Sequence, residues 1–341
     1  MRIGAHVRAG GRLVPALERA EAIGADVVQV FTQSPRAWKP TQYPDEVLAG
    51  YRGAQAAHPS VGATFCHATY LINLASATAE LLARSRDTLA VNLAVARRMG
   101  ADGLVVHLGS HKGAGFAGAL AQMADALVEV LEAAPPAAVV GDAGDGPGLG
   151  PCPVLLENTA GAGGTVGRTF EELAAVIERA GRRAGAQLGV CLDTQHLWAS
   201  GVGFATPEEA DAVVGAVDGA VGLERLGCLH LNDSKVERGT SRDRHANVGE
   251  GTIGAAALGC LIAHPALDGL AAILEVPGAG DGPRAEDVSA ARAALAAGRR
   301  RWARAAPKLR VPARPPHAGR DVPRQAVGPN RAGRLRSQEA R

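Results

Sequence analysis

Eight short apolar segments, rich in β-branched residues or Leu, recur along the chain, and each has the length of a buried strand. Helical patterns lie between them: residues 12–24 carry an apolar stripe that ends at Gly24, and residues 80–100 carry another that ends at Gly100. The eight segments are residues 2–7, 27–31, 62–67, 103–108, 154–158, 188–193, 228–233 and 271–277. Eight alternations of strand and helix predict an α/β fold, a (β/α)8 TIM barrel, with an open doubly wound sheet as the alternative.

Two segments interrupt this pattern. Residues 133–153 are rich in Gly and Pro and have no periodicity, which predicts an extended surface loop before the fifth strand. From residue 303 onward, Pro alternates with Arg and apolar residues are few, so we expect one barrel domain over residues 1–302 and a disordered basic tail over residues 303–341. Residues 299–341 contain 13 Lys and Arg against two acidic residues, whereas the whole chain has a net charge of +2. The body is therefore acidic, and the tail has the composition of a tether to nucleic acid or to a charged surface.

Composition narrows the class of protein. Aromatic residues make up 3% of the chain, which argues against an aromatic surface that stacks bases. The five cysteines are widely spaced, without a CxxC pair, so neither a disulfide framework nor a thiolate zinc site is indicated. No apolar segment has the length of a signal peptide or a membrane span. We therefore expect a soluble cytoplasmic protein, and, without a sign of obligate association, a monomer.

The chemistry-bearing residues lie at the ends of the expected strands. The carboxyl ends of barrel strands face the catalytic mouth. With 10 histidines and 34 acidic residues in 341, six successive strand ends of this kind are not expected by chance. Strands three to eight end in His67, His107, Glu157, Asp193, His230 and Glu275.

Three more residues of the same types lie nearby in the sequence: His196, three residues past Asp193, and Asp243 and His245 in the loop after the seventh strand. Imidazole and carboxylate ligands without thiolate suit Zn²⁺, with Mn²⁺ or Fe²⁺ as weaker alternatives. Nine ligands exceed what one ion needs, so two or three ions are expected, with one carboxylate bridging. Such a cluster favours in-line displacement at phosphorus.

The remaining histidines are less informative. His6 and His111 lie at the catalytic end, where each either orients a ligand or bonds within its own loop. We expect His58, His264 and His317 to be solvated, because they fall in helices, at a helix end or in the tail.

Several motifs, in this order and spacing, closely resemble the endonuclease IV family of apurinic/apyrimidinic endonucleases. The resemblance covers about residues 1–280, and HLNDSK followed by DRH and GEG is its most specific part. The motifs are IGAHV, VFTQSPRAW, CHATYLINLAS, VVHLGSH, LLENTAGAG, GVCLDTQH, HLNDSK, DRHANVGEGTIG and ILEVPG. The resemblance implies a TIM barrel with three Zn²⁺ ions that cleaves double-stranded DNA 5′ to abasic sites and leaves a 3′-hydroxyl and a 5′-deoxyribose phosphate.

The resemblance also implies roles for individual residues. His67, His107 and Glu157 would hold one zinc, and Glu157 would bridge to a second that Asp193, His230 and Glu275 complete. The third would lie between His196, Asp243 and His245. Glu157 and Glu275 would be catalytic as well as ligating, a hydroxide bridging the metals would attack the phosphorus, and Arg36 and Tyr70 would insert into the duplex at the damaged site.

The chain also departs from the family pattern. Ala68 stands where a polar residue is expected, Leu108 replaces a Pro, and Gln195 replaces a small residue. None is an expected ligand, but each is close enough to alter ligand orientation or loop shape. Two other functions stay open: a sugar isomerase or epimerase with one metal, for which five of the nine residues would be surplus, and a catalytically silent module that binds damaged DNA.

Overall fold

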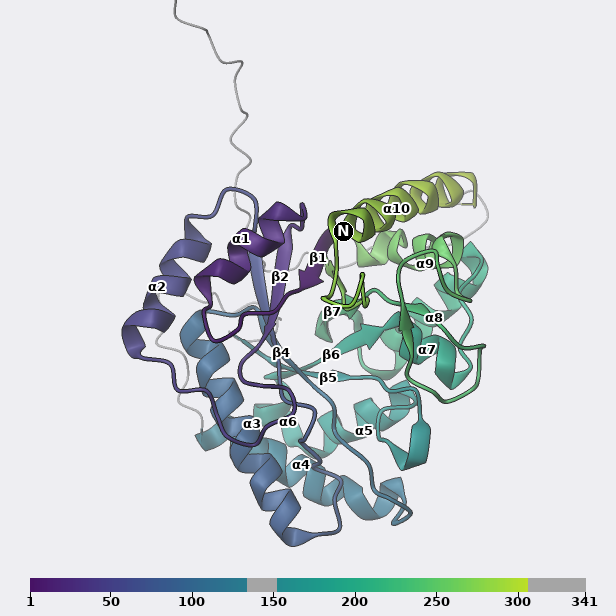
Figure 1. The fold of residues 1–341 in the computed structure, drawn as a ribbon. Coiled ribbons are helices and arrows are strands. Elements are labelled where there is room, and N and C mark those ends of the chain that lie inside the picture. The colour runs from purple at the N-terminus through teal and green to yellow at the C-terminus, as the bar shows by residue number, and fades with distance from the viewer. Residues whose placement is uncertain (134–151, 306–341) are drawn as a thin grey trace, which may run out of the picture.

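Eight parallel strands close into a barrel in the computed structural model, which describes residues 1–133 and 152–305 (Figure 1). The strands are β1 (Arg2–His6), β2 (Val27–Phe31), β3 (Ala63–His67), β4 (Gly103–Val106), β5 (Val154–Glu157), β6 (Leu188–Asp193), β7 (Leu226–His230) and β10 (Ala271–Leu274). Around the barrel their order is β1, β10, β7, β6, β5, β4, β3, β2. The sheet is closed, which confirms the TIM barrel and removes the open sheet that the apolar pattern alone left as an alternative.

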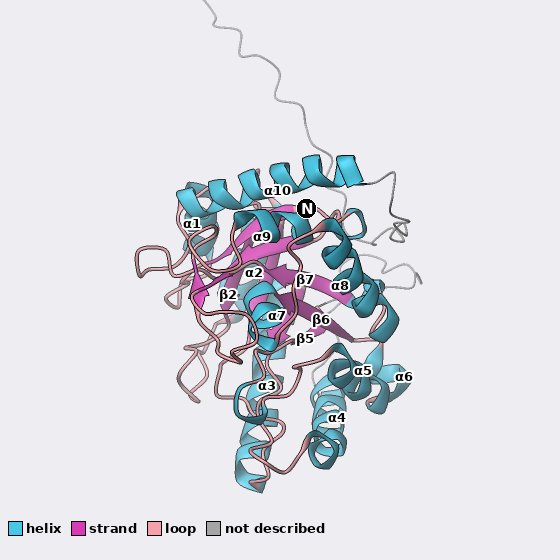
Figure 2. Cartoon of the chain, turned by 90° about the vertical axis from the view of Figure 1, so that its right-hand side faces the viewer, coloured by secondary structure: helices cyan, strands magenta, loops and turns pink. Residues whose placement is uncertain are grey.

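Helices cover the outside of the barrel, as Figure 2 shows around the magenta strands. They are α1 (Val14–Ala22), α2 (Asp45–Ala56), α3 (Ala79–Met99), α4 (Phe116–Ala133), α5 (Phe170–Arg179), α6 (Gly181–Gly185), α7 (Thr194–Ser200), α8 (Pro207–Ala220), α9 (Ala255–Ile262) and α10 (Ala285–Ala305), with short 3₁₀ turns at Ala162–Gly164, Leu223–Arg225 and Pro265–Leu267. The two helices expected from their apolar stripes are α1 and α3. Gly100 ends α3 in a left-handed conformation, with φ of 73°. Among the described helices, none combines the length and the hydrophobicity that a membrane span requires.

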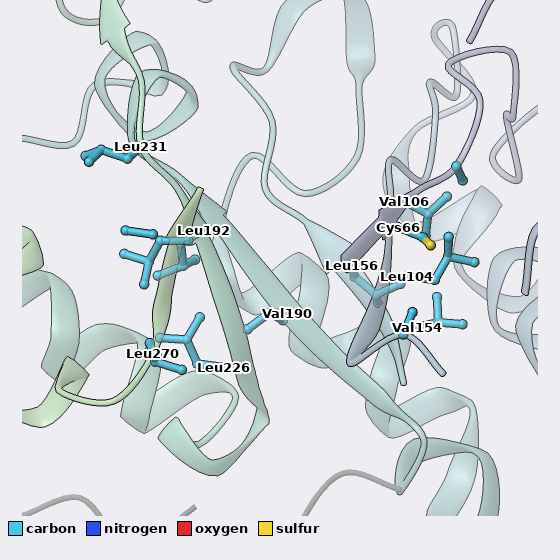
Figure 3. Packing of buried hydrophobic residues seen from close by; sticks show 14 of the residues in the cluster. Cys66, Leu104, Val106, Val154, Leu156, Val190, Leu192, Leu226, Leu231 and Leu270 are labelled. Atoms are coloured by element: carbon cyan, nitrogen blue, oxygen red, sulfur yellow. The ribbon is translucent and has the colours of Figure 1, made fainter. Parts of the chain in front are cut away.

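Side chains of each strand alternate between two apolar layers. The outer layer packs under the helices, and Figure 3 shows part of it, including Leu104 and Val106 on β4. The inner layer is a smaller cluster inside the barrel, consisting of Val27, Ala63, Phe65, Val105, Leu155, Cys191, Cys228, Ala271 and Ile273. Leu155 fills the space left by two glycines, because a Cβ at Gly103 or Gly227 would lie 2.7 Å or 2.6 Å from its methyl carbons. The lower barrel is therefore packed with apolar side chains and two thiols, and the imidazole and carboxylate groups of the strand ends lie above this cluster.

Helix α10 crosses α9 at very close range (Figure 1). A Cβ at Gly298 would collide with the carbonyl of Gly259, so the two backbones are in direct contact there. Trp302 is 4% exposed, and its indole N–H donates to the carbonyl of Cys260 at 2.8 Å. The helix continues to Ala305, three residues beyond the expected domain boundary at 302. The expected tail from residue 306 onward, like most of the expected loop at 133–153, lies outside the described residues.

The prediction that His264 is solvated is wrong. His264 is 1% exposed, its Nε2 lies 3.1 Å from Asp211 Oδ1, and its ring meets Trp302 edge-on at 4.7 Å. The segment after α9 turns inward under α10, which sequence periodicity does not reveal. His58 is half-buried and accepts a hydrogen bond from the backbone N–H of Val61, and His317 lies outside the described residues.

Candidate metal centre

The six strand-end residues lie together at the carboxyl end of the barrel. His67, Glu157, Asp193 and His230 are the last residues of β3, β5, β6 and β7, while His107 and Glu275 directly follow β4 and β10. Strand parity explains why all six point inward. Ala63 and Phe65 belong to the inner apolar cluster, so His67, two positions further along β3, faces the same axis.

The other three residues come from the segments that follow β6 and β7. His196 lies in the first turn of α7, where the side chain of Asp193 caps the helix by accepting the His196 backbone N–H at 2.8 Å. His245 belongs to β9 (His245–Ala246), which pairs with β8 (Asp233–Ser234) in a short antiparallel ladder. Asp243 precedes this ladder, with one carboxylate oxygen 3.4 Å from His196 Nε2 and the other 3.2 Å from His245 Nε2.

The structure brings eight of the nine residues into three groups in which every candidate ligand atom lies within 4.8 Å of the others. These groups are His67 with His107 and Glu157, then Glu157 with Asp193, His230 and Glu275, and then Asp193 with His196 and His245. Glu157 belongs to the first two groups and Asp193 to the last two. The ninth residue, Asp243, joins the third group through its two contacts with the histidines. The arrangement matches the ligand division that the family resemblance implies, and adds Asp193 as a second shared carboxylate.

Buried carboxylates in this centre face imidazoles rather than cationic side chains. Glu157 and Asp193 are both 0% exposed. Among the described residues, no Lys or Arg forms an ion pair with them. Burial opposes a charged imidazole, but Asp193 and Asp243 raise the pKa of His196 to about 10 and that of His245 to about 9. Protons on these two imidazoles therefore offset part of the buried negative charge, and a bound cation would displace them.

Hydrogen bonds to outer acceptors orient most of the rings. The Nδ1–H groups of His67 and His196 donate to the backbone carbonyls of Ala68 and Asn158 at 2.7 Å and 2.9 Å. In each case the other ring nitrogen, Nε2, faces a carboxylate of the centre. His230 has the opposite arrangement, with Nδ1 2.8 Å from Glu157 Oε1. One nitrogen of each ring is therefore held from outside and the other is directed at the centre, as in metal sites.

The residues fit a group of metal ions. His107 Nδ1 is a buried polar atom without a hydrogen-bond partner among the described residues. His245 Nε2 is buried as well, and Asp243 Oδ1 lies 3.2 Å from it but not in hydrogen-bond geometry. A buried polar atom that lacks a partner is costly, and a cation beside it would remove that cost. The donor set of imidazole nitrogens and carboxylate oxygens suits Zn²⁺ or Mn²⁺.

Sequence reasoning missed Gln29, which lies inside the barrel on β2 and is 0% exposed. Its Nε2–H donates to Glu275 Oε1 at 2.7 Å, and its Oε1 accepts from His230 Nε2–H at 3.1 Å. His6 accompanies it, with Nδ1 2.7 Å from the same oxygen of Glu275. Of the two roles left open for His6, the structure supports orientation of a ligand-type residue. A polar residue inside the apolar segment VVQVF was the signal that could have revealed Gln29.

Two asparagines that the sequence analysis did not single out hold Asp193 in place. Asn158 accepts the Asp193 backbone N–H at 2.6 Å. Asn232 donates from Nδ2 to Asp193 Oδ2 at 2.6 Å and accepts the Glu275 backbone N–H at 3.0 Å. Each follows a ligand-type residue closely in sequence, at positions 157 and 230, so the strand ends supply both ligands and the groups that fix them.

Arg36 and Tyr70 lie on two loops beside the centre. Tyr70 is 53% exposed, and its ring meets that of His67 edge-on at 5.5 Å, while Arg36 is exposed. The loops are joined because the Tyr70 backbone N–H donates to the carbonyl of Pro35 at 3.1 Å. Asn92 on α3 connects them further, accepting from the Thr32 hydroxyl at 2.8 Å and from the Thr69 backbone N–H at 3.2 Å. Both residues thus lie on exposed loops beside the centre, and neither is among the grouped ligands.

The remaining positions of interest lie around the centre. Ala68 and Leu108 are buried at the ends of β3 and β4. Gln195 is 0% exposed and donates to the carbonyl of Arg242 at 2.9 Å, which ties α7 to the loop that carries Asp243. His111 accepts hydrogen bonds from two backbone N–H groups of its own loop, at Gly113 and Gly115. Of the two roles left open for His111, the structure supports the loop residue.

Comparisons with known proteins cover most of the chain. A family model described as a xylose isomerase-like TIM barrel matches residues 17–302. A protein named probable endonuclease 4 from Halorhodospira halophila is 38% identical over 280 residues, which are 82% of this chain and 89% of that protein. The crystal structure of endonuclease IV from Thermus thermophilus is 33% identical, with a TM-score of 0.71 over 87% of this chain and 99% of that one.

A crystal structure of a D-tagatose 3-epimerase-like protein also resembles this chain, with a TM-score of 0.61 over 88% of this chain and 97% of that one. Its identity is 17%, so it shares the fold alone. The relatives named for endonuclease 4, in contrast, exceed 30% identity over more than four fifths of the chain. The chain therefore belongs to the endonuclease IV family, within the xylose isomerase-like TIM barrels.

Proposed function

We propose that this chain is a DNA-repair endonuclease that hydrolyses the phosphodiester bond 5′ to abasic sites in double-stranded DNA, leaving a 3′-hydroxyl and a 5′-deoxyribose phosphate. The observation that carries the proposal is the three groups of ligand-type residues that share Glu157 and Asp193, in a member of the endonuclease IV family. An isomerase or epimerase with one metal would leave five of these residues without a role, namely His67, His107, His196, Asp243 and His245.

The proposed cofactors are three Zn²⁺ ions, with Mn²⁺ as the alternative, held by the nine residues described above. When bound, such ions neutralise the charge of the reacting phosphate and supply a water of lowered pKa. Glu157 joins the first two groups of ligand-type residues, and Asp193 joins the last two. Because both side chains are fully buried, they hold these groups in a constant position relative to one another. The hydrogen bonds from Gln29 and Asn232 keep Glu275 and Asp193 in position, so little reorganisation is needed during the reaction.

Arg36 and Tyr70 are the proposed contacts to the damaged site. Both lie on joined loops next to the centre, and Tyr70 offers an exposed aromatic ring. An abasic nucleotide lacks base stacking and is easier to extrude than a paired one, by a few kcal/mol. Side chains that occupy the vacated space would convert this difference into selectivity. The acidic body makes such local contacts necessary, because most of the surface does not attract phosphate.

All five cysteines are free thiols, which supports the proposed location in a reducing cytoplasm.

The test uses duplex DNA with a single abasic site and analysis of both product ends. Wild-type protein should cut 5′ to the lesion, and Glu157→Gln should abolish cleavage, because the amide removes the carboxylate that two groups share. Glu132→Gln, on the exposed surface of α4, is the matched control and should cleave normally. Elemental analysis should give about three zinc ions per chain, whereas about one would favour the isomerase. Wild-type rates in Glu157→Gln would contradict the assignment of Glu157.

A further inference from the structure

Two cysteines lie side by side inside the barrel, directly beneath the candidate metal centre. Cys191 on β6 and Cys228 on β7 are register partners in adjacent strands, and their Sγ atoms are 3.5 Å apart. Both are 0% exposed and belong to the inner apolar cluster. None of the nine ligand-type residues is a cysteine, so the centre described above makes no use of these thiols.

His230 lies next to the two thiols and offers a third ligand atom. It lies two positions beyond Cys228 on the same inward face of β7, and the three side chains offer ligand atoms within 4.8 Å of one another. In a tetrahedral site with metal–sulfur bonds of about 2.3 Å, two sulfur ligands are about 3.8 Å apart. The observed separation of 3.5 Å needs only a small adjustment to accept such an ion.

We propose that Cys191, Cys228 and His230 form a second metal site, selective for thiolate-seeking cations such as Cd²⁺ or Cu⁺. Soft thiolate ligands select these ions over the harder ones that imidazole and carboxylate groups prefer. Binding releases the two thiol protons, because the thiolate is the ligating form. An ion arriving from the mouth meets His230 first, since this residue lies one inward rung above Cys228.

Occupation of this site competes with the centre above it. His230 Nδ1 is 2.8 Å from Glu157 Oε1 and 3.2 Å from Glu275 Oε2, which places it in the central group of ligand-type residues. A neutral imidazole serves one ion through one nitrogen. A soft ion held by the two thiols therefore withdraws His230 from the central group. Such ions would thus weaken metal binding in the centre above.

The test is to titrate Cd²⁺ into the protein as purified and to monitor the ultraviolet absorption band that arises from thiolate-to-metal charge transfer. The wild type should develop this band and saturate at about one equivalent per chain. Cys191→Ala and Cys228→Ala should each lose most of it. Cys260→Ala is the matched control, because Cys260 is equally buried but lies on α9, and its band should equal that of the wild type.

Cadmium NMR of the wild type provides a readout that does not depend on how well the variants fold. Its chemical shift should report two sulfur ligands. A shift typical of nitrogen and oxygen ligands alone, or a band that persists in Cys191→Ala and Cys228→Ala, would overturn the proposal. A metal-sensitive dye should also detect resident metal released by one equivalent of Cd²⁺ from the wild type but not from Cys228→Ala. We also expect Cd²⁺ binding to abolish DNA cleavage. This last expectation alone rests on the proposed function, so the spectroscopic result stands or fails independently of it.

Discussion

Gln29 offers a sharp test of how the barrel interior supports the candidate metal centre. We expect Gln29→Met to weaken metal retention without preventing folding. Met has a similar length and volume but neither donates nor accepts the bonds that Gln29 makes to Glu275 and His230. The His230 ring then loses the acceptor that fixes which of its nitrogens faces the centre.

The magnitude follows from the bonds removed. Gln29 is fully buried, and its 2.7 Å bond to the Glu275 carboxylate is a hydrogen bond to a charged group, worth about 1.5–3 kcal/mol. Each 1.4 kcal/mol corresponds to about a factor of ten in an equilibrium constant. We therefore expect metal affinity to fall about 10- to 100-fold, which is also the usual cost of removing a partner that orients a metal ligand.

The assay is competition for metal with a chromophoric chelator, alongside thermal unfolding with excess metal. Gln187→Met is the matched control, because Gln187 lies just before β6 at the opposite end of the barrel, where its side chain accepts a hydrogen bond from Arg97. The control should retain metal like the wild type. If Gln29→Met also retains metal and cleaves abasic DNA like the wild type, then the bonds from Gln29 do not support the centre and the reasoning is refuted.

Three further predictions concern recognition, the tail and pH. Arg36→Ala and Tyr70→Ala should weaken binding to abasic duplex more than to undamaged duplex, with zinc content unchanged; equal loss on both duplexes would reduce these residues to general contacts. A chain ending at Ala305 should fold normally, and the slope of log binding constant against log salt should become shallower by about 0.9 for each phosphate contact that the tail made; an identical slope would show that the tail does not bind DNA. Burial lowers the pKa of His264, although its hydrogen bond to Asp211 opposes this. The unfolded chain then binds the proton more readily than the folded one. The contribution of neutral, buried His264 to the free energy of unfolding should therefore be complete above about pH 6.5 and decrease below it, by at most about 1.4 kcal/mol per pH unit. Urea unfolding of the wild type and of His264→Leu at several pH values measures this contribution. If the free energies of unfolding of the two proteins change with pH in parallel, His264 is not the titrating group.

The sequence by itself determined the barrel and the residue types at its mouth. Each expected strand overlaps an observed one, because buried parallel strands are apolar on both faces and therefore stand out as short apolar segments. Strand ends in a barrel converge on one face, so the position of His67 or Glu275 in the chain already implied its place in the fold. The motifs identified the family for the same reason, since they lie at those strand ends.

Tertiary structure decided which residue is shared between two groups of ligands and which side chains hold the ligands in place. Asp193 joins two ligand groups because α7 folds back over the end of β6 and brings His196 beside it, a contact that depends on a loop rather than on strand periodicity. Gln29 supports Glu275 and His230 across the barrel axis, although more than 200 positions separate it from each of them. His264 is buried because α10 closes over it. Hydrophobic periodicity records which side of an element is buried, but not which distant element covers it, so these pairings arise only once the barrel has closed.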